Sequence, residues 1–469
     1  MKRSQDYVEE FWKFCSQNRA KRGREKDYEQ ALSSLMDTFH ITGGTPLKGE
    51  VTLSGAKNAA SKMMIASLLT NESVIIENVP RQQETDITSE IVTTVGAQVT
   101  WENEHTLRLI TPDIKSTSVH LLSRKNRISI LALAPLLHRT GEGFVPFLGG
   151  DAIGPRPVDF HLEVLGRMGA HIEERQDGYF ASVKKRLKGA LITLPYPSVG
   201  ATETAILAGV LAEGRTMIVN AANEPEVSDL IMMLQNMGAI IQVNAGRSIE
   251  ILGVEKLHGT QACVIADRNE AISYACMALG TKGEIFVRGA QHEHLMTFLN
   301  AVRKIGGHYE VKQDGILFIG SPDYKGIELE TDTHPGFMTD WQQPFVVVLT
   351  QAKGISVVHE TVYEERFGYT RVLNEMGANV TLFSNCLGEI PCRFKGQNYK
   401  HSAVITGPTS LHAADVTVPD IRAGLAFVVG ALVGNGTSVL QGIEHLDRGY
   451  ERLEEKLRAI GAHIKRVQS

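Results

Sequence analysis

The sequence predicts an α/β protein of two similar lobes, each built from three copies of one repeating unit. Two recurrent features carry this prediction. A tag of the form apolar-Gly-Ala/Gly-x-apolar occurs six times, and an apolar helix followed by a glycine-containing turn and a β-rich run recurs between the tags. Neighbouring tags are 68 to 73 residues apart, except the last two, which are 84 apart. The tag glycines are Gly96, Gly169, Gly238, Gly306, Gly377 and Gly461.

Each unit is expected to contain two helices and several strands. The tag closes a helical pattern, as in residues 452–462, and its glycine is suited to the helix C-cap before an alternating strand. The other helix, as in residues 205–214, is apolar nearly all round and is therefore expected to be buried. Six units with buried helices and outer strands divide three and three, which predicts a cleft between two lobes rather than an open solenoid.

Composition excludes several classes of function. Hydrophobic residues make up 43% of the 469 residues, and a net charge of −5 gives no global attraction for nucleic acid or an anionic membrane. No signal peptide and no stretch of about 18 apolar residues is present, so we expect no membrane insertion and a cytoplasmic protein. The cysteines are scattered, with no CxxC and no histidine at metal-binding spacing, which favours free thiols in a reducing compartment. They are Cys15, Cys263, Cys276, Cys386 and Cys392.

Residues 1–36 differ from the repeats. Apolar side chains recur at helical spacing between Tyr7 and Phe14, and a charged segment follows them. The extension is expected to form an amphipathic helix that packs on the main body, or one that docks on a partner.

Residues 147–159, FLGGDAIGPRPVD, combine the parts of a mobile catalytic loop. Glycines make the first half flexible around Asp151, while Pro155 and Pro157 fix the backbone on either side of Arg156. A lone carboxyl group held over a substrate out of water stays protonated near neutral pH and can act as an acid. The same residue types are typical of an ordinary surface turn, which is the alternative.

Charged and small polar residues recur where helices begin. Lys57 and Asn58 begin one helix, Arg127 enters another, and the Ser198 segment suits a phosphate contact or a plain N-cap. Equivalent helix starts of a repeat protein converge on one side of each lobe, so these groups are expected to crowd one cleft and to handle a small, multiply charged anion. The remaining charged residues at helix starts are Glu224, Glu226, Asp267, Arg268, Asp340, Glu360, Arg366, Asp420, Arg422, Asp447, Arg448 and Glu451. Glu224 and Glu226 are equally explained as first-turn helix acids.

Taken together, the motifs SGAKNA, SVGAT, HPGFMTDWQ and HLDRGYERLEEKLRAIGA, with the glycine-rich loop, resemble the UDP-N-acetylglucosamine enolpyruvyl transferase family over about residues 38–467. The resemblance implies a two-domain inside-out α/β barrel with six β-α units. It implies lobes of residues 57–266 and of residues 37–56 joined with 267–469. It also implies transfer of the enolpyruvyl group of phosphoenolpyruvate to the sugar 3′-hydroxyl with release of phosphate, an early step of peptidoglycan synthesis, without a metal or organic cofactor.

The resemblance assigns roles residue by residue. Asp151 would protonate the methylene carbon, Asp340 would act on the attacking hydroxyl, and Lys57 and Arg448 would complete the catalytic set. The phosphoenolpyruvate-binding set would be Lys57, Asn58, Arg127, Arg156, Arg422 and Arg448. The nucleotide-sugar set would be Asn58, Arg127, Arg156, Pro157, Val158, Asp159, Phe160, His161, Ser198, Val199, Gly200, Asp340 and Val362. The supporting set would be Glu224, Glu226, Asp267 and Asp420.

The sequence departs from the family pattern in two places. The usual loop cysteine is replaced by Asp151, a form also known in the family. Tyr196 and Gln83 stand where basic residues are frequent, which leaves open an acceptor other than UDP-N-acetylglucosamine. Another uridine nucleotide, shikimate 3-phosphate, or a non-catalytic nucleotide-sugar-binding role are the alternatives. The sequence does not indicate an oligomeric state.

The loop aspartate predicts resistance to fosfomycin, which alkylates the family's cysteine. We expect the protein to keep its activity after incubation with fosfomycin, and its pH optimum to report the titration of Asp151. Phosphate release measured before and after incubation, with mass spectrometry of the loop peptide, checks this. Irreversible inactivation through residue 151 would contradict the prediction.

Overall fold

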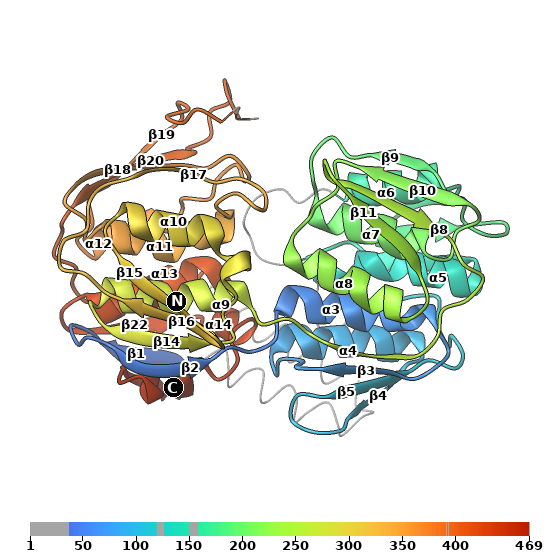
Figure 1. The fold of residues 1–469 in the computed structure, drawn as a ribbon, viewed down its shortest axis with the longest axis horizontal. Coiled ribbons are helices and arrows are strands. Elements are labelled where there is room, and N and C mark those ends of the chain that lie inside the picture. The colour runs from blue at the N-terminus through green and yellow to red at the C-terminus, as the bar shows by residue number, and fades with distance from the viewer. Residues whose placement is uncertain (1–36, 120–125, 150–157, 391, 393, 469) are drawn as a thin grey trace.

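The computed structural model describes residues 37–119, 126–149, 158–390, 392 and 394–468. Two lobes lie side by side, and the described strands form six sheets, three in each lobe (Figure 1). This arrangement confirms the predicted α/β fold with three units in each lobe.

Three sheets cover the first lobe. Their strands are β13 (Thr260–Cys263), β3 (Val74–Glu77), β5 (Leu107–Ile110) and β4 (Gln98–Trp101); β6 (Glu142–Pro146), β8 (Gly178–Ser182) and β7 (His171–Arg175); and β11 (Ile240–Asn244), β12 (Ser248–Leu252), β10 (Arg215–Val219) and β9 (Leu191–Thr193). Its helices are α3 (Lys57–Ala66), η1 (Ser67–Leu69), α4 (Gln83–Val95), η2 (Ile128–Ala132), α5 (Leu133–Thr140), α6 (Asp159–Arg167), α7 (Val199–Gly209) and α8 (Pro225–Asn236).

The second lobe repeats the pattern. Its strands are β15 (His308–Lys312), β16 (Gly315–Ile319), β14 (Glu284–Arg288) and β2 (Lys48–Thr52); β17 (Glu328–Glu330), β18 (Gly354–His359), β20 (Ser402–Gly407) and β19 (Val380–Phe383); and β21 (Asp415–Thr417), β22 (Thr437–Gln441), β1 (Thr38–Thr42) and β23 (His463–Val467). Its helices are α9 (Arg268–Gly280), η3 (His292–His294), α10 (Met296–Lys304), η4 (Thr339–Trp341), α11 (Gln342–Leu349), α12 (Thr370–Glu375), α13 (Ile421–Val433), α14 (Glu444–Asp447) and α15 (Leu453–Ala459).

The helices that are apolar all round occupy the centre of each lobe. In the second lobe, α9, α11 and α13 pack against one another, and every residue of α9 and α11 is buried. In the first lobe, α3 and α7 are buried along most of their length. Helices inside and sheets outside define the inside-out barrel, because a helix without a polar face must be surrounded by other elements.

Two separate hydrophobic cores lie on either side of paired chain crossings. One core is drawn from residues between 56 and 264, and the other from residues 39–53 and 271–464. At the crossings, the Ala56 amide donates to the Ile265 carbonyl at 2.7 Å, and the Asp267 amide donates to the Ser54 carbonyl at 2.9 Å. We propose that the lobe boundaries lie at these crossings.

The six tag glycines all have positive φ, between 86° and 127°. Each follows the end of a helix and precedes a strand, as Gly169 does between α6 and β7. The predicted glycine C-caps are therefore confirmed, because left-handed backbone is costly for any residue with a Cβ.

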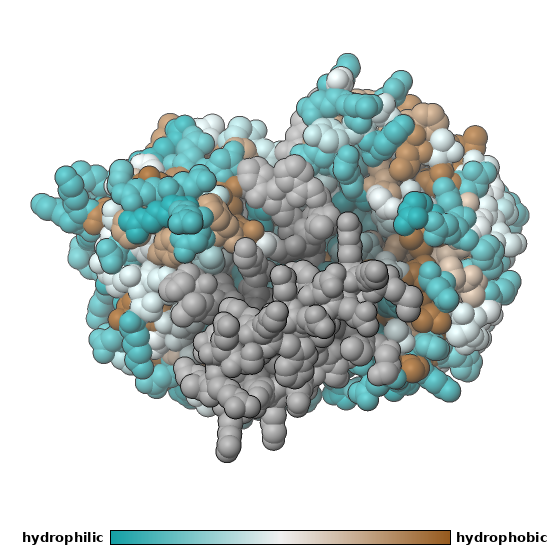
Figure 2. All heavy atoms as spheres, turned by 180° about the vertical axis from the view of Figure 1, so that it is seen from behind, coloured by the Kyte–Doolittle hydropathy of each residue, from teal (hydrophilic) through white to brown (hydrophobic). Residues whose placement is uncertain are grey.

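Hydropathy was compared over one face of the molecule and along the described helices. Most side chains in view on both lobes are hydrophilic, with hydrophobic residues scattered between them (Figure 2). Among the described residues, every helix is too short or too polar to cross a bilayer.

Two glycines, one inside α6 and one just after it, test the C-cap argument, because alanine is expected to change the free energy of unfolding in opposite directions at the two positions. A Cβ would meet no atom within 4 Å at either Gly166, inside α6, or Gly169, where φ is +94°. We expect Gly169→Ala to lower the free energy of unfolding by about 1 kcal/mol through backbone strain. Gly166→Ala is the matched control and should raise it by about 0.5 kcal/mol. Denaturant unfolding measures both values, and equal effects of the two variants would contradict the C-cap role.

Candidate active site

In the second lobe, two arginines hold the carboxylate of Asp340. Arg366 Nη2 donates to Asp340 Oδ1 at 2.6 Å, and Arg422 Nε donates to Oδ2 at 3.0 Å. Burial alone would raise the pKa of Asp340, but the charges of Arg422 and Arg366 outweigh it and hold that pKa well below its usual value. Asp340 is therefore ionised at neutral pH, and its side chain remains 24% exposed.

Arg422 is aimed at Asp340 by contacts on both of its ends. Its main-chain amide donates to Oδ1 of Asp420, which caps α13, at 2.8 Å. Its guanidinium Nη1 donates to the Tyr450 hydroxyl at 2.8 Å. Burial raises the pKa of Tyr450 to about 12, so this hydroxyl stays neutral and accepts the bond. The guanidinium is thereby held between a neutral oxygen and the carboxylate.

A buried glutamate fixes the short helix that carries Asp340. Glu360 Oε2 accepts from Thr339 Oγ1 at 2.9 Å and from Gln342 Nε2 at 2.6 Å, on both sides of Asp340. Its other oxygen accepts from the Val362 amide at 2.7 Å. The backbone at Val362 is thus tied to the same carboxylate that positions η4.

The starts of α3 and α9, from different lobes, meet at Asp267. Asp267 caps α9, because its Oδ1 accepts from the amides of Asn269 and Glu270 at 2.7 and 3.2 Å. Its Oδ2 accepts from the amide of Lys57, the first residue of α3, at 3.4 Å. The Lys57 side chain lies beside Gly449, where a Cβ would be 3.6 Å from Lys57 Cδ. Lys57 therefore reaches across to the second lobe.

A glutamate of the first lobe is bonded to Arg448 of the second lobe and lies within the electrostatic influence of Lys57. Arg448 Nε, in the second lobe, donates to Oε2 of the buried Glu84 at 2.8 Å. Burial raises the pKa of Glu84, but the nearby charges of Lys57 and Arg448 outweigh it and lower the pKa below its ordinary value. Lys57 and Arg448, both predicted to bind one anion, therefore converge on one carboxylate.

A second ion pair across the lobes is fully buried. Arg268 Nε and Nη2 donate to the two oxygens of Glu226 at 2.9 and 2.8 Å, and both side chains are less than 5% exposed. The neighbouring Glu224 is also buried, and burial raises its pKa. Glu226 is thus a partner of Arg268 rather than only a first-turn helix acid.

His161 packs against Gly200, and both residues belong to the predicted nucleotide-sugar set in the first lobe. Its Nδ1 is 2.7 Å from Thr204 Oγ1, and a Cβ at Gly200 would lie 2.7 Å from its ring, so only glycine fits there. Burial, together with the charge of Arg127, lowers the pKa of His161 to about 3. The ring is therefore neutral. Ser198 accepts from the Ala201 amide at 3.4 Å and so acts as an N-cap.

The remaining predicted residues have separate places. Asn58 and Val199 lie in the first turns of α3 and α7, and α6 begins with the exposed Asp159 and the half-buried Phe160, after the buried Val158. Asp151, Arg156 and Pro157 lie outside the described residues, as does the extension 1–36.

Sequence reasoning missed Glu84 as a member of the site and did not assign Arg366 or Tyr450 a role. Arg366 lies in a conspicuous run of charged residues and Tyr450 in the DRGYER motif, so both carried a signal. Glu84 follows Gln83 at the start of α4 and carried none, because its partner is on the other lobe.

Comparisons with known proteins identify the family of the chain. The family model for EPSP synthase (3-phosphoshikimate 1-carboxyvinyltransferase) matches residues 41–457. The UDP-N-acetylglucosamine 1-carboxyvinyltransferase of Protochlamydia amoebophila is 48% identical over 92% of this chain and 95% of its own length. That of Chlamydia trachomatis serovar D is 47% identical over 92% of this chain and 98% of its own.

Solved structures share the fold at lower identity. The enolpyruvyl transferase NikO from Streptomyces tendae superposes with a TM-score of 0.81 at 22% identity, over 92% of this chain and 99% of that one. An EPSP synthase from Acinetobacter baumannii gives a TM-score of 0.70 at 18% identity, over 92% and 100%.

Because His161 is neutral in the folded protein, we expect the free energy of unfolding to fall as the solution is acidified. Its folded pKa of about 3 lies below the ordinary 6.5, so the unfolded chain binds a proton that the folded protein does not as pH falls through this window. The contribution of the neutral ring to the free energy of unfolding is complete above pH 6.5 and is lost as the pH falls toward 3. In His161→Asn, we expect unfolding free energy to fall less steeply with acid, by up to about 1 kcal/mol per pH unit.

Unfolding of both proteins at several pH values measures this difference. His308→Asn, at an exposed position of β15, is the control for loss of a surface histidine. Parallel acid profiles for the wild type and His161→Asn would contradict the buried neutral ring.

Proposed function

The chain belongs to the UDP-N-acetylglucosamine 1-carboxyvinyltransferases of the EPSP synthase family, and on this premise we propose how its residues perform the reaction. The protein transfers the enolpyruvyl group of phosphoenolpyruvate to the 3′-hydroxyl of UDP-N-acetylglucosamine and releases phosphate. The observation that supports the proposed roles most strongly is the convergence of Lys57 and Arg448, from different lobes, on the carboxylate of Glu84.

Phosphoenolpyruvate presents a carboxylate and a phosphate on one small molecule, so it needs several cations at short range. Lys57 and Arg448 bind it from opposite lobes. Arg422 and Asn58 belong to the same proposed binding set. Glu84 occupies Arg448 in the structure, so the substrate anion competes with a carboxylate for this guanidinium. Arg127 and Arg156 complete the proposed set.

Asp340 receives the proton of the attacking hydroxyl. A carboxylate with a strongly lowered pKa is a weak base, because Arg366 and Arg422 favour its charged form. A substrate phosphate beside Arg422 offsets part of the arginine charge and raises the pKa of Asp340 toward a useful value. Substrate binding therefore activates the base, and Asp340 orients the hydroxyl before it accepts the proton.

The reaction also requires an acid that protonates the methylene carbon of phosphoenolpyruvate. Asp151 gives a proton to the methylene carbon, the sugar oxygen bonds to the neighbouring carbon, and a tetrahedral adduct forms. Loss of a proton from the methyl group then re-forms the double bond as the carbon–oxygen bond to phosphate breaks. Closure of the loop 147–159 over the substrates excludes water, which would otherwise attack the same carbon.

The nucleotide sugar is placed by the first lobe. In this proposal, the residues from Val158 to His161 at the start of α6 and from Ser198 to Gly200 at the start of α7 contact it from the first lobe. Val362 and Asp340 contact it from the second lobe. The close packing of Gly200 on His161 brings these two segments together.

An assay of phosphate release tests the assigned roles. With phosphoenolpyruvate and UDP-N-acetylglucosamine, we expect Asp340→Asn and Asp151→Asn each to reduce kcat by about 10²- to 10⁴-fold, the usual contribution of a general acid or base. Both variants should still bind UDP-N-acetylglucosamine by calorimetry. Asp113→Asn, at an exposed position outside the site, is the control.

Other acceptors are tested in the same assay. Turnover with shikimate 3-phosphate or another uridine nucleotide, but not with UDP-N-acetylglucosamine, would contradict the proposal that UDP-N-acetylglucosamine is the acceptor. Unchanged turnover in Asp340→Asn would contradict the role of that carboxylate while leaving the reaction itself intact.

A further inference from the structure

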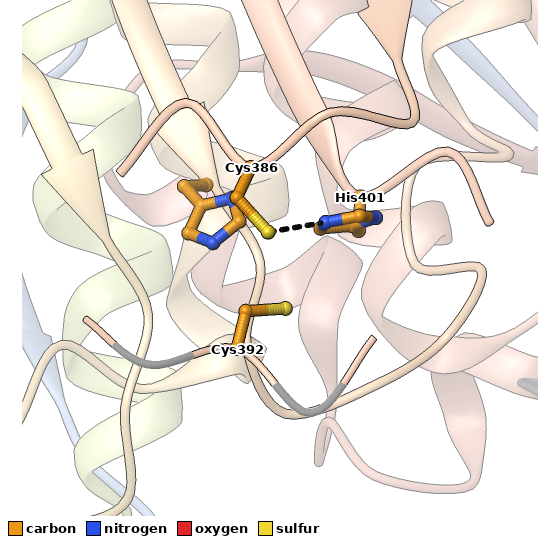
Figure 3. Close-up of side chains that lie close together, drawn as sticks. Cys386, Cys392 and His401 are labelled. Carbon is orange, nitrogen blue, oxygen red and sulfur yellow. Dashed lines mark hydrogen bonds between the residues drawn. The ribbon is translucent and has the colours of Figure 1, made fainter. Parts of the chain in front are cut away.

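Two cysteines and two histidines, none of them in the proposed catalytic or substrate-binding sets, form a cluster in the second lobe. The potential ligand atoms of His359, Cys386, Cys392 and His401 all lie within 4.8 Å of one another. Cys386 Sγ is 3.5 Å from His401 Nε2, and Cys392 points toward the same space (Figure 3). Sulfur and nitrogen ligands of one tetrahedral zinc ion are about 3.5 Å apart, given the usual bond lengths to zinc.

Strand pairing brings these residues together from distant parts of the chain. β18 and β20 are antiparallel, and His359 at the end of β18 is opposite Ser402, the residue after His401. The two cysteines lie in residues 384–401, which join β19 to β20. This connection lies within the longest interval between tags. Spacing along the sequence did not indicate this cluster, because His359 comes from another strand.

Hydrogen bonds leave Nε2 of both histidines available to a metal. His401 Nδ1 donates to the Tyr399 carbonyl at 2.8 Å. The Ser402 hydroxyl donates to the Asn385 carbonyl at 2.7 Å, so its oxygen accepts from His359 Nδ1 at 2.9 Å. In both rings the proton is on Nδ1, as in most metal-bound histidines.

The Nε2 atom of His359 is a buried polar atom without a hydrogen-bond partner. The residue is completely buried, and no donor or acceptor in the described part of the chain bonds to this nitrogen. A buried polar group left unsatisfied costs roughly 1–3 kcal/mol. A metal ion at the centre of the cluster would satisfy it.

Hydrogen bonds hold the connection that carries the two cysteines. The Phe394 amide donates to Cys392 Sγ at 3.3 Å, a contact that favours a thiolate. The amides of Glu389 and Ile390 donate to the carboxylate of Glu330 on β17 at 2.7 and 2.8 Å. The two bonds to Glu330 hold the segment against the sheet that carries His359.

We propose that His359, Cys386, Cys392 and His401 bind one structural zinc ion. Two thiolates and two imidazoles are a ligand set that zinc prefers, and four protein ligands leave no open position for a substrate. The ion fixes residues 384–401 to the sheet of β17, β18, β20 and β19. Both cysteines are free thiols in the structure, so a disulfide between them is the competing outcome.

Metal analysis of the full-length protein tests the proposal. Protein purified under reducing conditions should contain about one zinc ion per chain. After chelation, titration with Co²⁺ should give a thiolate-to-cobalt charge-transfer band and the visible bands of tetrahedral cobalt, and Zn²⁺ should displace them. These measurements need no variant, so they do not depend on the folding of one.

Variants identify the ligands. Cys386→Ser and Cys392→Ser should each weaken or abolish the charge-transfer band, while Cys263→Ser, an exposed cysteine on β13, should keep it. Ser402→Ala should weaken zinc binding by roughly 10- to 100-fold, because it removes the partner that orients His359. Circular dichroism confirms that each variant is folded.

Two results would overturn the proposal. One is the absence of both bound zinc and the cobalt spectrum in the reduced, folded protein. The other is metal binding that both cysteine variants retain. Titration of three thiols instead of the five cysteines of the sequence, in unfolded protein kept free of reductant and metal, would identify the disulfide instead.

Discussion

Charge buried where the two lobes meet is the constraint on which the rest of the structure depends. Glu226 of the first lobe is enclosed with Arg268 of the second, and Glu84 with Arg448. Removing one member of such a buried pair costs about 3–5 kcal/mol, because the other charge remains without water or a partner. The starts of α3, α8 and α9 are therefore held where these pairs can form, and that placement brings Lys57 beside Gly449.

The same electrostatics link the fold to catalysis. Asp340 is kept ionised by Arg366 and Arg422, and Glu84 is kept ionised by Lys57 and Arg448. Each carboxylate thus interacts with cations that we propose bind the substrate anion. In the proposed mechanism, bound phosphoenolpyruvate offsets part of this positive charge and so raises the pKa of Asp340.

Local features of the sequence were enough to predict the architecture. Glycine tags such as Gly169 predict where helices end, and helices without a polar face predict an interior of helices. The helix-start residues Lys57, Asp340 and Arg422 lie close enough for their charges to interact. Contacts between distant segments were not predictable. The partner of Arg448 is on the other lobe, and His359 reaches the cysteines only because β18 pairs with β20.

A double-mutant cycle of Lys57→Met and Arg448→Gln tests the central claim most directly. The claim is that these cations, from different lobes, act on one molecule of phosphoenolpyruvate. We expect each variant to lower kcat/KM for phosphoenolpyruvate, and the double variant to lose much less than the product of the two effects, because the second loss removes a contact already impaired. Strictly multiplicative losses, or unchanged kcat/KM in either single variant, would contradict the account.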